Sequence, residues 1–377
     1  MFQLLRDGAP RTRSELATMT GQARSTIAAR IDVLTEAGLI ASVGEASSTG
    51  GRRPATFAFN PASRIVIGVD LGAAHARVAA ANLAAEIVAS NEHPLDIADG
   101  PEKVLALVAD MAKQAIAEAG YEPHSVAAIG IGLPGPVEHS TGKPIAPPIM
   151  PGWDGYDVAG NLRKEFGVPV LVDNDVNLMA VGEHRTAWHD HTNMLFIKVA
   201  TGIGSGIIMD GELRRGAQGA AGDIGHIALS SHQEVACTCG NTGCLEAIAG
   251  GNAVAAHLRS QGIDTHNVTD VVAAVRDGNA EARAAVREAG REIGVILAGC
   301  VSMMNPSLVV VGGAMVAAGE QLMAGIREVL YRRSLPLATQ HLRVVTSHTR
   351  EKAGVRGGAY LALDHVLSPA AIDTLFS

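Results

Sequence analysis

Three cysteines and one histidine stand close together in the second half of the sequence: His226, Cys237, Cys239 and Cys244. Three thiolates and one imidazole form a ligand set that suits a closed structural zinc site. A disulfide would leave one of the three cysteines unpaired. The pattern therefore predicts a zinc ion, Zn²⁺, that is bound by these four side chains.

The alternative interpretation is that the cysteines are small buried hydrophobic residues, as many cysteines are. This interpretation suits the fourth cysteine, Cys300, which lies in an apolar helical run. Asp223 and Glu246 flank the predicted ligands, and His226 has a second ring nitrogen that can face a cavity. We expect these three side chains to form a pocket wall that recognises hydroxyl groups.

Asn174 and Asp175 follow an apolar segment that reads as a β-strand. Ligands of α/β sheets bind at the ends of such strands. The Asp175 carboxylate could act as a general base towards a sugar hydroxyl, and the Asn174 amide offers a donor and an acceptor. Such a pair is also a common helix start. Glycine-containing turns at 70–75 and 201–206 could bind phosphates through backbone N–H groups, although each is a weak signal alone.

Length and composition indicate a large folded protein. The chain has 377 residues, of which 47% are hydrophobic and only 3% aromatic, so aliphatic side chains must fill its cores. This length suggests two or three domains. The N-terminus lacks a signal-peptide pattern, and no apolar run reaches the length of a membrane span. We expect a cytoplasmic protein without a membrane partner.

The charge is distributed unevenly along the chain. The formal net charge is −8, yet residues 1–62 contain seven arginines and five acidic residues, a balance of +2. The remaining residues therefore carry −10. A basic segment attached to an acidic body indicates a polyanion as the partner of the first segment, although a balance of +2 is weak evidence alone.

Residues 11–40 have the pattern of a helix-turn-helix. A first helix begins near Thr12 or Ser14, either of which can cap it, and a break follows at residues 20–22. The second helix, at residues 23–37, has apolar residues spaced by four and three. Its polar side, which we expect to enter the major groove of DNA, carries Arg24, Ser25, Thr26 and Arg30.

Strands at 39–43 and 56–59 would complete a winged helix. The loop between them, 47–54, is rich in glycine and contains Arg52 and Arg53. Arginines at such a tip can reach phosphates or the minor groove. A solvated loop on a helical oligomerisation module is the alternative, and the motif context favours DNA binding.

The rest of the chain alternates strands and helices, which predicts an α/β fold. A strand, glycine turn and strand at 66–82 is repeated at 194–210, so we expect two copies of one α/β unit with a cleft between them. The predicted domains are a DNA-binding domain at 1–62, a first lobe at 63–190 that a C-terminal helix at 352–366 completes, and a second lobe at 191–351 with the zinc loop.

Five segments together carry a resemblance: 130–136, 173–177, 202–206, 221–226 and the cysteine segment 237–246. They resemble the ROK family of repressors and sugar kinases, and residues 48–54 resemble its regulator branch. The resemblance implies an actin-like (ribonuclease H-like), two-lobed sugar-kinase fold behind an N-terminal winged helix-turn-helix. It also implies structural zinc on the four residues named above. The implied sugar contacts are Asn174, Asp175, Asp223, His226 and Glu246, with Asp175 as the base in kinase members.

Two positions depart from the family pattern. Kinase members carry Asp-x-Gly-Gly-Thr-Lys at the first phosphate turn, where this chain has Asp70-Leu-Gly-Ala-Ala-His75. The lost threonine hydroxyl and lysine charge matter because phosphoryl transfer depends on positioned donors and charge. We therefore expect no ATP or Mg²⁺ cofactor. Asp223 stands where the family usually has glutamate, so the ligand need not be glucose.

These observations predict a sugar-responsive transcription regulator, a repressor of genes for carbohydrate metabolism. It would bind operator DNA and a sugar or sugar derivative, as a homodimer or homotetramer. The alternative is an ATP-dependent sugar kinase that retains a DNA-binding domain. A regulator that responds to a protein partner is a third interpretation, which Asp223 permits.

Overall fold

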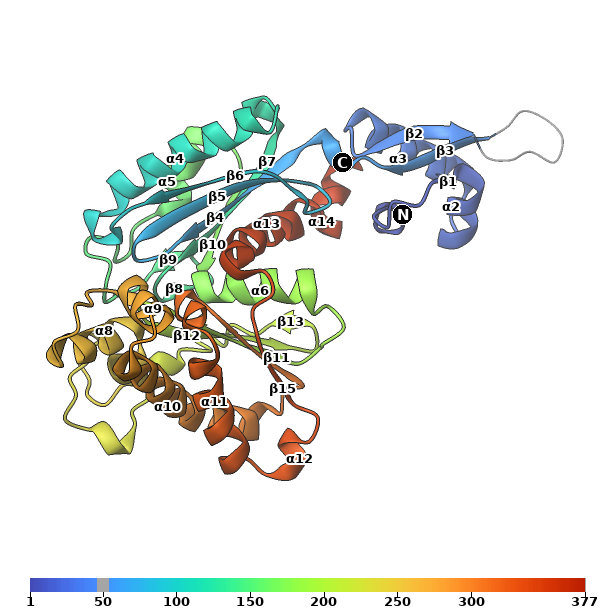
Figure 1. The fold of residues 1–377 in the computed structure, drawn as a ribbon. Helices are drawn as coiled ribbons and strands as arrows, with labels where there is room; N and C mark the ends of the chain where they lie inside the picture. The colour runs from blue at the N-terminus through green and yellow to red at the C-terminus, as the bar shows by residue number, and fades with distance from the viewer. Residues whose placement is uncertain (46–53, 377) are drawn as a thin grey trace.

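The computed structural model describes residues 1–45 and 54–376. Arg52 and Arg53, which we expect to contact DNA, lie outside the described residues. The chain forms an N-terminal unit and two lobes, each built around a sheet (Figure 1). None of the described helices combines the length and the apolar character that crossing a membrane requires.

The N-terminal unit contains three helices, α1 (Phe2–Leu5), α2 (Arg13–Thr20) and α3 (Arg24–Glu36). Thr12, one of the two expected caps, begins α2 in a capping box with Glu15, so both side chains satisfy free backbone N–H groups. Gly21 turns the chain with φ +67°, which glycine adopts without strain. The apolar face of α3 is buried as expected and comprises Ile27, Ile31 and Leu34.

A small sheet completes this unit. Strand β2 (Ile40–Glu45) pairs with β3 (Ala55–Phe59), and β1 (Arg11–Thr12) pairs with the other edge of β3. Both pairings are antiparallel. The two helices and two strands that the sequence predicts within residues 11–59 occur in the predicted order, and β1 is an additional strand.

The first lobe contains a five-stranded sheet in the order β10-β7-β4-β5-β6. Its strands are β4 (Ile65–Leu71), β5 (His75–Asn82), β6 (Ile87–Pro94), β7 (Val126–Leu133) and β10 (Val170–Asn174). Helices α4 (Pro101–Glu118) and α5 (Val158–Phe166) contribute buried apolar residues to the core on one face of this sheet. The short strands β8 (Val137–Glu138) and β9 (Lys143–Pro144) form a separate pair.

The second lobe repeats this topology. Its sheet has the order β13-β12-β11-β14-β15, with two antiparallel pairings followed by two parallel ones, which is the pattern of the first sheet read from β6 to β10. Its strands are β11 (Met194–Val199), β12 (Ile203–Met209), β13 (Glu212–Leu213), β14 (Leu308–Gly312) and β15 (Arg343–Thr346). The repeat agrees with two copies of one α/β unit.

Helices enclose the core of the second lobe on one side. They are α7 (Leu245–Ala249), α8 (Gly251–Ser260), α9 (Val268–Arg276), α10 (Ala280–Met304) and α11 (Glu320–Arg333). Cys300 lies in α10 and packs against this core, in agreement with its expected apolar role. The short α12 (Pro336–Thr339) follows α11, and α14 (Pro369–Asp373) closes the chain.

Two helices lie between the sheets, and each covers the sheet of the other lobe (Figure 1). Helix α6 (Asp175–Ala187) directly follows a strand of the first sheet, yet its apolar residues share a core with β11, β12 and β14. Helix α13 (Ala353–Val366) follows the second sheet but packs against β4 and β7. A boundary at residue 190 thus separates α6 from the sheet that it covers.

Glycines allow the backbones of α6 and α13 to pack directly against each other. A Cβ atom on Gly357 of α13 would lie 1.8 Å from the Leu178 carbonyl oxygen of α6. A Cβ atom on Gly182 of α6 would lie 2.0 Å from the Ala353 carbonyl oxygen. Any larger side chain at these positions would force the two helices apart.

Glu183 of α6 holds the segment that leads from β15 into α13. Its buried carboxylate accepts hydrogen bonds from Ser347, His348 and Thr349, and Trp188 donates a further one. Burial raises the pKa of Glu183, but the hydrogen bonds outweigh burial and hold the pKa below its ordinary value. The carboxylate therefore stays ionised and ties the two lobes together at this crossing.

The sequence predicts a turn at 201–206, and the structure corrects this prediction. Strand β12 already begins at Ile203, so Gly204 and Gly206 lie within the sheet. A Cβ atom on Gly206 would lie 2.5 Å from the Ala180 side chain of α6. These two glycines serve the packing of α6, and only residues 200–202 remain as a turn.

We predict that Gly357→Ala lowers the midpoint of thermal unfolding by several degrees, because overpacking a tight interior contact costs about 1–3 kcal/mol. Gly299→Ala is the matched control, since a Cβ atom on Gly299 of α10 would meet no atom of any neighbouring element. There alanine should stabilise the helix by roughly 0.5–1 kcal/mol. Differential scanning calorimetry measures both, and equal midpoints would contradict the close contact of α6 and α13.

Candidate functional site

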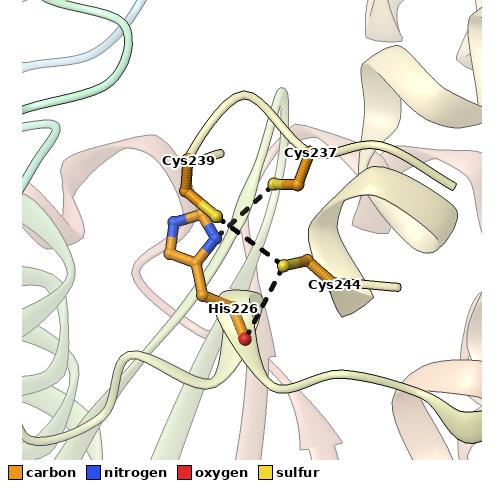
Figure 2. Close-up of side chains that lie close together, drawn as sticks. All are labelled: His226, Cys237, Cys239 and Cys244. Atoms are coloured by element: carbon orange, nitrogen blue, oxygen red, sulfur yellow. Dashed lines mark hydrogen bonds between the residues drawn. The ribbon is translucent and has the colours of Figure 1, made fainter. Parts of the chain in front are cut away.

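The four residues of the predicted metal site come together in the structure. The ligand atoms of His226, Cys237, Cys239 and Cys244 all lie within 4.8 Å of one another. Figure 2 shows the imidazole and the three sulfur atoms pointing towards a common centre. The His226 Nδ1 atom is 3.7 Å from the Cys237 sulfur, and the Cys239 and Cys244 sulfurs are also 3.7 Å apart. This cluster could hold a metal ion.

Short local elements position these ligands. His226 ends a single turn of 3-10 helix at Ile224–His226, and Cys244 is the N-cap residue of α7. The Cys237 backbone N–H donates to the Asn241 carbonyl oxygen at 2.8 Å, which closes a tight turn around Cys239. The turn thereby presents two sulfurs to the side chains of His226 and Cys244.

The thiols of the cluster have opposed pKa shifts. A backbone hydrogen bond at Asn241 lowers the pKa of Cys239 to about 7. Burial, together with the neighbouring cysteines, raises the pKa of Cys244 to about 12. Crowded sulfurs that resist joint ionisation are stabilised by a bound cation, which is the ligand chemistry that suits a soft divalent metal.

A cleft of about 960 Å³ lies between the two lobes. Strand ends and loops of both sheets line it. All five residues expected to contact a sugar are on its wall: Asn174, Asp175, Asp223, His226 and Glu246. The structure thus brings together residues that are far apart in the sequence, and their role as sugar contacts remains a prediction.

Hydrogen bonds within the protein determine which polar atoms of these residues remain for a ligand. Asn174 caps α6, its side-chain oxygen accepting from Val176 and Asn177, while its amide donates to the Gly135 carbonyl at 3.0 Å. Glu246 accepts a hydrogen bond from the Ile203 N–H at 3.0 Å, which orients its carboxylate. Asp223 lies at the cleft, immediately before the turn that ends at His226.

Asp173 and Arg215 form an ion pair between the lobes, which the sequence did not predict. Arg215 lies in the loop after β13 and donates from Nε to the buried Asp173 carboxylate of β10 at 2.6 Å. In the same loop the Gln218 carbonyl accepts from the His139 N–H beside β8. No local sequence pattern pairs these residues, because they meet only when the lobes pack.

Lys198 was also missed, although it is charged. It stands near the end of β11 and forms an ion pair with Asp175. Burial lowers the pKa of Lys198, but Asp175, Asp70 and Glu246 outweigh it and raise the pKa above its ordinary value. Burial raises the pKa of Asp175, and Lys198 offsets part of that rise. One sequence feature could have identified Lys198: it is the only charged residue in the apolar segment 194–199, Met-Leu-Phe-Ile-Lys-Val.

The predicted DNA-contacting residues differ in accessibility. Arg24, Ser25 and Thr26 are exposed at the start of α3. Arg30 donates to the Gln22 side chain at 3.0 Å and places its guanidinium 5.6 Å from the centre of the Phe376 ring. Arg30 is thus partly engaged within the protein, and its contact with DNA stays a prediction.

The fold and the cleft define a two-lobed α/β protein with the actin-like arrangement of ROK regulators and sugar kinases. The sequence profile of the ROK family matches residues 66–365. The chain belongs to the ROK family.

Two relatives and one solved structure illustrate the similarity. A xylose repressor of Caldicellulosiruptor bescii is 28% identical over 371 residues, which cover 95% of this chain and 92% of the relative. A glucokinase of Halalkalibacterium halodurans is 31% identical over 314 residues, covering 79% of this chain and 94% of the relative. The crystal structure of a ROK family transcriptional regulator, a homologue of the E. coli MLC protein, superposes with a TM-score of 0.81. It is 24% identical and covers 99% of this chain and 96% of that one.

We predict that the purified protein contains about one metal ion per chain, and that Cys237→Ser loses it because three ligands bind far more weakly than four. Inductively coupled plasma mass spectrometry measures the metal content. Cys300→Ser is the control and should retain the ion, since Cys300 lies in α10 outside the cluster. Unchanged metal in Cys237→Ser would contradict the site.

Proposed function

We propose that the protein is a sugar-responsive transcription regulator, and specifically a repressor, in which the cleft binds the effector and the N-terminal unit binds operator DNA. One observation carries this proposal: a single helix, α13, reaches from the cleft to the N-terminal unit. The xylose repressor among the relatives supports it, since that match covers 95% of this chain and 92% of the repressor.

The first end of α13 lies at the cleft. A Cβ atom on Gly354, in the first turn of α13, would lie 2.3 Å from the carboxyl carbon of Asp70, a cleft residue. The start of α13 is therefore in direct contact with the cleft wall. A change in the separation of the lobes would move this end of the helix.

The other end of α13 lies against the N-terminal unit (Figure 1). Leu363 and Leu367 share a hydrophobic core with Phe2 and Leu5 of α1. The Gln3 side chain donates to the Leu367 carbonyl oxygen at 2.8 Å. The helix would thereby transmit a displacement at the cleft to the unit that carries α3.

Sugar binding would act through differential affinity. An effector that binds one separation of the lobes more tightly shifts the protein towards that state. In a homodimer or homotetramer, the shift would change the spacing of two α3 helices, and paired half-sites on DNA require a defined spacing. This is how a ligand in the cleft would release the operator.

We further propose that the metal is a structural Zn²⁺ held by His226, Cys237, Cys239 and Cys244. Three thiolates and one imidazole are the soft ligands that zinc prefers. When bound, the ion would join the turn that follows Asp223 to the start of α7, which carries Glu246. The cluster would thus position two of the carboxylates that we expect to bind the sugar.

Sugar kinase activity is a second candidate function. One of the relatives is a glucokinase, and Asp175 lies in the cleft where a kinase base would act. The first turn does not carry the residues that kinase members use for phosphate, since Ala73, Ala74 and His75 replace them. We therefore favour regulation over catalysis. An assay for ADP release over a panel of sugars separates the two functions.

A first experiment tests whether the N-terminal unit binds operator DNA. Genomic fragments that the wild-type protein enriches by affinity selection serve as probes in fluorescence anisotropy at fixed salt. We predict that Arg24→Ala lowers the affinity roughly tenfold, because an exposed arginine at the start of α3 contacts a base or phosphate.

The matched control for DNA binding is Arg283→Ala. It removes the same charge from an exposed position on α10 in the second lobe, so the affinity should stay unchanged. An enriched fragment that both variants bind equally well would place the DNA contact elsewhere. A failure to enrich any fragment would overturn the proposed regulator.

A second experiment tests whether the cleft binds a sugar. We predict that one sugar among D-xylose, D-glucose and N-acetyl-D-glucosamine raises the midpoint of thermal unfolding, since binding to the folded state stabilises it. Asp223→Ala should abolish that rise while DNA binding persists. Asp264→Ala, which removes a carboxylate that is 94% exposed outside the cleft, is the control and should respond as the wild type does. A response that survives in Asp223→Ala would remove Asp223 from the sugar site.

A further inference from the structure

The cleft contains a buried ion pair that no local sequence pattern predicts. The Lys198 ammonium meets the Asp175 carboxylate, and their side chains are only 18% and 3% exposed. The other Asp175 oxygen accepts the Val176 N–H at 2.8 Å. Both oxygens of the carboxylate expected to act as a base are thus already engaged by the protein.

A second buried carboxylate, Asp70, lies at the same cleft and faces basic groups of its own. Its side chain is 7% exposed, and it lies 3.6 Å from both the His75 imidazole and the Arg77 guanidinium. Burial raises the pKa of Asp70, but His75, Lys198 and Arg77 outweigh it and hold the pKa below its ordinary value. Lys198 therefore acts on both carboxylates, one by contact and the other through its charge.

The turn between β4 and β5 is filled by the chain itself. A Cβ atom on Gly72 would lie 2.2 Å from the His75 ring, so the imidazole lies directly over this glycine. Arg77 holds the ring, with its Nη1 atom 2.9 Å from His75 Nε2, and is itself fixed by Glu92 at 2.8 Å. A phosphate group could approach the Gly72 backbone only after His75 had moved away.

Carboxylates in this setting commonly bind a divalent cation. Mg²⁺ uses one or two protein carboxylates together with phosphate oxygens in kinase sites. Here an ammonium group with three donors already neutralises one of the two buried carboxylates. A metal ion would have to displace it and leave a buried, uncompensated lysine, which is strongly unfavourable.

We propose that Lys198 is a built-in cation that replaces a divalent metal ion at Asp175 and Asp70, and that it makes the cleft selective for a sugar without a metal–nucleotide complex. The proposal deepens the proposed function, on which its sugar-binding part rests. Lys198 is thus a specificity-determining residue. Sequence comparison with the kinase turn at 70–75 alone could not identify it, because Lys198 lies on the other lobe.

The test is Mn²⁺ binding, measured by electron paramagnetic resonance on the full chain at pH 8, with no DNA or sugar present. Lys198→Met removes the charge and keeps an unbranched side chain, while Lys198→Arg keeps the charge. We expect Lys198→Met to bind Mn²⁺ roughly tenfold or more tighter than the wild type does, because two carboxylates become free. Lys198→Arg should behave as the wild type, and adding Asp175→Asn to Lys198→Met should remove the gain.

Two outcomes would overturn the proposal. One is a Lys198→Met protein that keeps the wild-type thermal midpoint but gains no Mn²⁺ site. The other is that the wild-type protein binds Mn²⁺ and that Asp175→Asn abolishes this binding. This second outcome can be observed even if the Lys198 variants fail to fold. Neither measurement depends on DNA or sugar, so the proposed regulation can fail while the role of Lys198 stands, and the reverse also holds. ADP release is not expected from Lys198→Met, since His75 still covers Gly72.

Discussion

The close contact of α6 and α13 with each other and with the sheets is the constraint on which the rest of this structure depends. It is made by backbone atoms, because glycines stand where side chains would keep the elements apart. Gly357 lies against the Leu178 carbonyl, and a Cβ atom on Gly130 of β7 would lie 2.0 Å from the Gly358 carbonyl. Dense packing of this kind transmits displacement, since no space is left in which a helix could shift alone.

This constraint also places the chemistry. Asp175 begins α6 and Gly354 lies in the first turn of α13, so the starts of both helices lie at the cleft. Each helix follows one sheet and covers the other, and Glu183 ties their crossing to the end of β15. Under the proposed regulation, a ligand that changes the separation of the lobes would move both helices. The far end of α13 shares a hydrophobic core with the N-terminal unit.

The cleft combines features of two kinds of ROK protein. The expected sugar wall is retained beside a cysteine cluster able to hold a metal. The expected phosphate side instead holds the chain's own charged groups, with His75 over Gly72 and Lys198 on Asp175. The chain's own groups therefore already engage the Asp175 carboxylate and cover Gly72. This arrangement is consistent with the proposed sensing of a sugar, because sensing requires binding and no chemical step.

The sequence alone determined the features that depend on short-range patterns. The strands and helices, the repeated unit, the capped α2 and the Cys₃His set all follow from spacing and periodicity over a few residues, and the family resemblance added the sugar wall. Only the tertiary structure decided the rest. It showed that Gly204 and Gly206 serve helix packing, that Arg30 rests on Phe376, and that Lys198 meets Asp175. These contacts join residues far apart in the chain, and which residues meet is set by how whole elements pack, a property that no local pattern contains.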